Sequence, residues 1–108
     1  MGRTLAVVVL FGLLVVAGRG LAPPAAATYD PSDEWQGLPE GEGREEVYFN
    51  CVACHSMAIV QQQRMNETVW QRTLTRMVDE MGMPALPEDE HKLVIDYLVE
   101  HFGQDVPR

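Results

Sequence analysis

The sequence is poor in residues that bind metals or form covalent cross-links: its 108 residues include only two cysteines and three histidines. Basic residues are also scarce, with eight Lys plus Arg against 16 Asp plus Glu, for a formal net charge of -8. Such an acidic chain repels the phosphates of nucleic acids and anionic lipids, so no nucleic-acid partner is expected. Its charge favours a protein partner with a positive docking surface.

Long hydrophobic runs are missing apart from one near the N-terminus, from Leu5 to Ala17. This run follows Arg3, is shorter than the roughly 20 apolar residues of a membrane span, and precedes the small residues Ala25–Ala27. A basic start, a short apolar region and small residues are typical of a cleaved secretory signal peptide. We therefore predict a signal peptide over residues 1–27 and a periplasmic protein, with membrane attachment only if this segment stays uncleaved.

The rest of the sequence lacks the two-residue alternation of strands and shows helical patterns instead. Residues 28–42, rich in Pro, Gly, Asp and Glu, are predicted to form an extended, weakly ordered N-terminal arm. A single all-α domain over residues 43–105 is expected to follow. Its helices are predicted at residues 43–54, 56–63, 66–81 and 87–103.

Both cysteines lie in the run Cys51-Val52-Ala53-Cys54-His55. On a helical turn, two thiols at this spacing can each form a thioether to a vinyl group of one haem, and the histidine that follows can bind its iron. The signature is specific because three reactive residues must fall in one register. It predicts one covalent haem c on Cys51 and Cys54, with His55 as the proximal axial ligand.

Two other uses of the cysteine pair remain open. An exported Cys-x-x-Cys can form a disulfide or a thioredoxin-like redox pair, although the sequence lacks the βαβ context of that fold. The two cysteines with His91 and His101 could instead bind zinc, although those histidines are ten positions apart. Neither alternative accounts for the histidine directly after the pair.

Further short motifs follow the cysteine pair: Ser56, Gln62-Gln63-Arg64, Trp70, Met77, Met83-Pro84, Tyr97-Leu98 and Phe102-Gly103. With these motifs, the chain from Gly43 to Gly103 resembles class I cytochromes c. In more detail it is similar to short single-haem bacterial cytochromes, some of which are cytochrome subunits of sulfite dehydrogenases. The resemblance implies a small class I cytochrome c-like fold with about four helices around one haem.

The sixth iron ligand is expected to be a methionine, whose sulfur stabilises ferrous iron and raises the reduction potential. Met77 lies at the matching position of the resembling group, on the same predicted helical face as Trp70. Met83, in the Met-Pro pair, is the alternative distal ligand, and Met81 is a third candidate. Plain packing in the core is the competing role for each of them.

Trp70 and Arg64 are candidate contacts of the haem propionates. An indole N–H can donate to a carboxylate, and a guanidinium group can pair with one. Packing of Trp70 in the core and solvation of Arg64 explain the two residues equally well.

These features predict an electron carrier without a substrate of its own, so no enzyme, although it could be the cytochrome subunit of a dehydrogenase. The expected partners are redox proteins: a periplasmic dehydrogenase as donor, and an oxidase or another cytochrome as acceptor. The alternative function is a haem-based ligand-binding or sensor protein whose sixth iron position is open.

Overall fold

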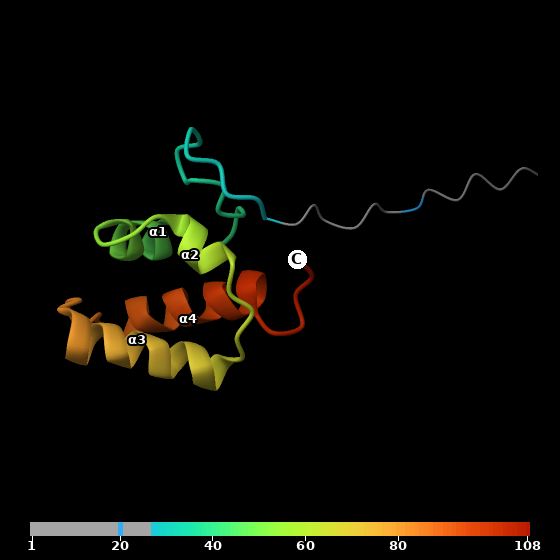
Figure 1. Cartoon of the computed structure of the whole chain (residues 1–108). Helices are drawn as coiled ribbons and strands as arrows, with labels where there is room; N and C mark the ends of the chain where they lie inside the picture. The colour runs from blue at the N-terminus through green and yellow to red at the C-terminus, as the bar shows by residue number, and fades with distance from the viewer. Residues whose placement is uncertain (1–19, 21–26) are drawn as a thin grey trace, which may run out of the picture.

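The computed structural model describes residue 20 and residues 27–108. Its described part is all-α, with helices α1 (Arg44–Val52), α2 (Met57–Gln61), α3 (Glu67–Met81) and α4 (Glu88–Phe102) (Figure 1). The all-α class and the four helices predicted from the sequence are thus confirmed. Several helices are slightly shorter than predicted, because the expected cap residues lie just outside them.

The predicted signal peptide, residues 1–27, lies almost wholly outside the described residues. Of that segment, Ala27 is described, and it packs against the hydrophobic core. No helix in the described part of the chain is long and apolar enough to cross a membrane.

The helix ends follow from residues that satisfy free main-chain groups. The side chain of Asn66 accepts a hydrogen bond from the amide of Val69 at 3.0 Å and so caps the start of α3. At the other end of α3, Gly82 adopts the left-handed conformation, with φ 79°, that terminates many helices. α4 begins after Pro87, and the acidic residues of its first turn interact favourably with the helix dipole.

The central element is α4, which packs against both α1 and α3, while α2 packs against α1 (Figure 1). The crossing of α1 and α4 is close because Gly43, with φ 90°, has no side chain: a Cβ there would lie 2.6 Å from the carbonyl oxygen of Leu93. Apolar side chains of all four helices share one core. Its buried members are Leu38, Val47, Cys51, Met57, Val60, Trp70, Leu74, Val94, Ile95, Tyr97, Leu98 and Phe102.

Residues 28–42 do not form the extended, weakly ordered arm that their composition predicts. They fold into turns in which Gln36 binds α2 twice: its side-chain oxygen accepts from the Met57 amide at 3.0 Å, and its carbonyl accepts from the Gln61 side chain at 2.8 Å. Leu38 is buried in the core. Composition alone does not reveal this order, because it does not show that polar groups of this segment form hydrogen bonds with another element, here α2.

Candidate functional site

An apolar cleft of about 80 Å³ lies between α3 and the end of α1. Figure 1 shows that the turn after α1 and the C-terminal end of α3 lie at the same end of the molecule. The cleft contains every residue that the sequence assigns to haem attachment or iron binding. Its walls are formed by Asn50, Cys51, Cys54, His55, Met77, Met81 and Met83.

The two cysteines occupy different environments in the same turn. Cys51 is in the last turn of α1 and is 6% exposed, whereas Cys54 follows the helix and is exposed. The amides of Cys54 and His55 both donate to the carbonyl of Cys51 at 3.4 Å, which keeps the motif in one helix-like turn. Both cysteines line one cleft, as attachment to a single haem requires.

Burial raises the pKa of the Cys51 thiol to about 11, and the neighbouring Cys54 adds to the increase. The thiol of Cys51 consequently stays protonated at neutral pH. A disulfide oxidoreductase needs a cysteine whose pKa is lowered, usually at a helix N-terminus, whereas Cys51 lies at a C-terminal end. These two facts disfavour the thioredoxin-like use of the pair.

The ring of His55 is half-buried at the edge of the cleft. Its Nδ1 lies 3.1 Å from the carbonyl oxygen of Ser56. Because a carbonyl oxygen only accepts, Nδ1 carries the proton in this contact and donates it. Nε2 is then the nitrogen with a free lone pair, and the hydrogen bond on the other nitrogen fixes the ring, as is usual for histidines that bind metals.

The methionines of the opposite wall differ in how firmly they are packed. Met77 and Met83 are half-buried and pack against the hydrophobic core. Met81, at the end of α3, is 66% exposed. Met77 and Met83 are therefore less exposed than Met81 and better packed in the cleft.

These residues fit a haem c group. Two thiols and one histidine with a free Nε2 stand on one wall, and thioether sulfurs stand on the other, in an almost entirely apolar surround. The cleft is smaller than typical pockets for ligands of that size, about 300–1,000 Å³. A bound haem therefore requires the two walls of the cleft to lie farther apart than they do in this structure.

The described residues contain no group of three His, Cys, Asp or Glu side chains close enough to hold a bare metal ion. His91 lies on α4 with its Nε2 2.7 Å from the side-chain oxygen of Gln71. His101 packs against Tyr97, with 4.4 Å between the ring centroids. Neither histidine lines the cleft of the cysteines, as the zinc alternative would require.

Trp70 and Arg64, the candidate propionate contacts, bind main-chain carbonyls instead. The indole Nε1 of Trp70 is buried and donates to the carbonyl of Phe102 at 3.2 Å. Arg64 donates from Nε to Val106 and from Nη2 to Pro107, each at 3.0 Å. Neither residue lines the cleft, and both donate to main-chain carbonyls near the C-terminal end of the chain, so the propionate contacts stay a prediction.

Asn50 is a wall residue that the sequence reasoning did not single out. Its side-chain nitrogen donates to the carbonyl of Glu46 at 2.8 Å and to the side chain of Glu90 at 2.7 Å, which joins α1 to the start of α4. No signal in the sequence singles it out, because residues i and i+1 of a helix point about 100° apart, so its place directly before Cys51 does not predict that both line one cleft. Its donors are committed to the scaffold, so it positions the wall.

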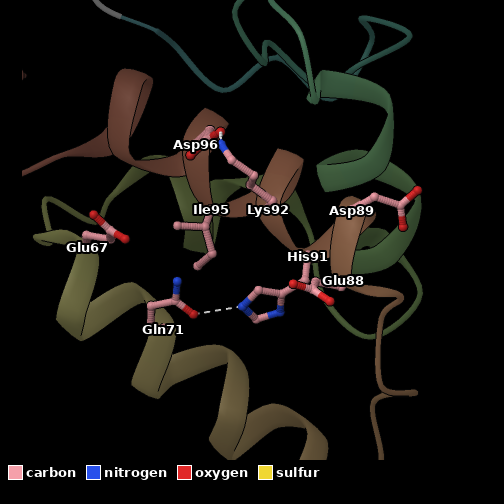
Figure 2. A pocket seen from close by; sticks show the side chains of 8 residues that line it. All are labelled: Glu67, Gln71, Glu88, Asp89, His91, Lys92, Ile95 and Asp96. Carbon is pink, nitrogen blue, oxygen red and sulfur yellow. Dashed lines mark hydrogen bonds and ion pairs between the residues drawn. The ribbon is translucent and has the colours of Figure 1, made fainter.

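The described residues also form a larger hollow, of about 680 Å³, between α3 and α4 (Figure 2). Half of the residues that line it are acidic, and its one lysine, Lys92, is paired with Asp96. Figure 2 shows His91 reaching across it to Gln71. The hollow is open and lined by no cysteine or methionine, so its size reflects a solvated groove between two helices.

Comparison of the chain with protein-family models, with curated proteins and with solved structures found no match. The likeness to class I cytochromes c thus rests on sequence motifs, and the function must be inferred from the cleft.

Proposed function

We propose that the protein is a periplasmic electron-transfer protein that carries one haem c. The haem is bound covalently through Cys51 and Cys54, and the axial ligands of the iron are His55 and Met77. It passes electrons from a dehydrogenase to a downstream acceptor. The observation that carries the proposal is the single apolar cleft that these four residues line, although Met77 lies on α3 and the other three lie at the end of α1 and in the turn after it.

Each residue has a separate role in this proposal. The thiols add across the vinyl groups and so fix the haem in one register. The hydrogen bond from His55 Nδ1 to Ser56 keeps the Nε2 lone pair free for the iron. Met77 supplies a soft sulfur from the rigid α3, where the helix holds it against the core.

The environment of the cleft suits a carrier. A haem bound here supplies a one-electron ferric/ferrous couple. The apolar walls exclude water, and a thioether ligand favours the ferrous state, so the chain raises the reduction potential. One proposed ligand, His55, is held by the turn after α1 and the other, Met77, by α3, which limits the structural change between the two oxidation states. Rapid electron transfer benefits from that rigidity.

The optical spectrum of the purified full-length protein in both oxidation states tests the proposal. We expect low-spin spectra in both states, a weak far-red sulfur-to-iron charge-transfer band in the oxidised state, and reversible one-electron reduction. The variant His55→Ala should lose the low-spin spectrum. The matched control His91→Ala, which changes a histidine outside the cleft, should keep it.

A high-spin oxidised spectrum together with rapid binding of carbon monoxide would contradict the carrier function. That result would mean that the sixth position is open, as in a haem-based sensor. A chain without any haem, in which the two cysteines form a disulfide, would contradict both functions.

A further inference from the structure

The cleft contains a second half-buried methionine besides the proposed ligand. Met83 lines the same cavity as Met77, Cys51 and His55. It lies on the non-helical segment between α3 and α4, and it packs against the core as Met77 does. Two half-buried methionines therefore line a cleft in which a haem iron needs only one thioether ligand.

A tight turn brings Met83 back to Met77. Gly82, with φ 79°, reverses the chain at the end of α3. The amide of Met83 donates to the carbonyl of Met77 at 2.9 Å, and the amide of Gly82 donates to the same carbonyl. A main-chain hydrogen bond thus joins the two methionines and keeps them close together, so that both line one cleft.

The turn has room to move. A Cβ built on Gly82 would meet no atom within 4 Å, so the turn is not held by packing. Met83 also lines a small hollow with Leu74 and Leu86, where its side chain has apolar neighbours when it is not used as a ligand. Met77 is fixed by its helix, whereas Met83 can shift with a short loop.

We propose that Met83 is a reserve axial ligand, which binds the haem iron when the sulfur of Met77 is lost. This inference rests on the proposed function. Loss of the Met77 sulfur as a ligand can follow from substitution, or from oxidation by hydrogen peroxide, which transfers one oxygen atom to the sulfur, leaves as water and makes the side chain a polar sulfoxide. Met83 then keeps the iron six-coordinate and prevents the carrier from becoming a ligand-binding haem protein.

The test uses leucine variants of the haem-loaded full-length protein, because leucine nearly conserves the volume of methionine and the core should stay packed. Met83→Leu should keep the wild-type spectrum and potential. Met77→Leu should stay low-spin and keep a far-red charge-transfer band at a shifted wavelength. The double variant should lose the band, become high-spin and bind carbon monoxide far faster than Met77→Leu. Met65→Leu, which changes a partly buried methionine outside the cleft, is the matched control and should behave as the wild type.

Proton NMR of the reduced protein gives a second readout. A methionine methyl group bound to the iron lies over the haem, whose ring current shifts its signal strongly upfield. That signal should move in Met77→Leu and vanish in the double variant.

The inference is overturned if Met77→Leu is high-spin and binds carbon monoxide as fast as the double variant. It is also overturned if Met83→Leu alone loses the band, since Met83 would then be the primary ligand. The wild-type protein tests the proposed function separately. If the wild type contains no haem, or lacks the far-red band, the proposed carrier function is refuted before any variant is compared.

Discussion

The indole Nε1 of Trp70 and the carbonyl oxygen of Phe102 form a buried hydrogen bond of 3.2 Å between the first turn of α3 and the last residue of α4. The amide of Met65 donates to the same carbonyl at 3.1 Å. One oxygen at the end of α4 therefore fixes the start of α3. This contact sets how α3 lies on α4, and with it the position of Met77 in the cleft.

Arg64 should contribute to stability and leave the haem unaffected. Its guanidinium group donates to the carbonyls of Gln61, Gln63, Val106 and Pro107, so it ties the C-terminal residues to the end of α2. Arg64→Ala leaves these acceptors without their charged donor and should lower the free energy of unfolding by about 2 kcal/mol in denaturant titrations. The midpoint potential should not change.

The matched control is Arg72→Ala, which removes an exposed arginine from α3 and should cost no more than about 0.5 kcal/mol. A fall in the midpoint potential in Arg64→Ala, but not in Arg72→Ala, would indicate that Arg64 does contact a haem propionate, because the loss of a nearby positive charge favours ferric iron.

The crossing of α1 and α4 depends on a glycine. In Gly43→Ala the new Cβ would lie 2.6 Å from the carbonyl oxygen of Leu93 and 3.1 Å from the Cβ of Tyr97, at a φ of 90°. Overpacking and backbone strain together should lower the free energy of unfolding by about 3–5 kcal/mol. Gly82→Ala has the same left-handed strain without the clash and should cost about 1 kcal/mol. Equal losses in the two variants would show that the helices do not approach closely at Gly43.

Tyr97 should make stability depend on alkaline pH. Its phenol donates to the carbonyl of Pro39 at 2.5 Å, and burial raises its pKa above the ordinary value of 10.0. Below pH 10 the folded and unfolded chains both keep the proton, so the group adds no pH dependence. Above pH 10 only the unfolded chain loses it, so the free energy of unfolding should fall as pH rises, by at most about 1.4 kcal/mol per pH unit.

Denaturant titrations between pH 8 and 11 on wild type and Tyr97→Phe measure this effect. The variant should be about 1 kcal/mol less stable at pH 8, because it lacks the hydrogen bond to Pro39. Its stability should fall less steeply above pH 10. Parallel curves for the two proteins would mean that the phenol ionises as readily in the folded chain as in the unfolded one.

The helices were predictable because their signals are local. Asn66, Pro87 and Gly82 act within one turn of their own positions, and the face shared by Trp70 and Leu74 follows from helical spacing alone. The placement of Cys51, Cys54 and His55 together was predictable for the same reason, since the three residues occupy one turn. The spacing of residues does not predict that Met77 meets that motif in one cleft, because the two lie on segments far apart in the sequence.

The roles that sequence reasoning missed depend on distant main-chain atoms. Trp70 and Arg64 have donors that suit carboxylates, but carbonyls of the C-terminal residues take them. Gln36 caps α2 from a segment whose composition suggests an unstructured arm. Side-chain donors do not reveal their acceptors when those acceptors are backbone oxygens, which every residue offers.

The central claim is the covalent haem, and the intact mass of the purified protein under denaturing conditions tests it most directly. The chain has only two cysteines, so both thioethers can be assigned without ambiguity. The account predicts the mass of the chain plus one haem, with neither Cys51 nor Cys54 open to a thiol reagent and no haem released by acidified solvent. The mass of the bare chain, with two thiols that react freely or a Cys51–Cys54 disulfide, would contradict it.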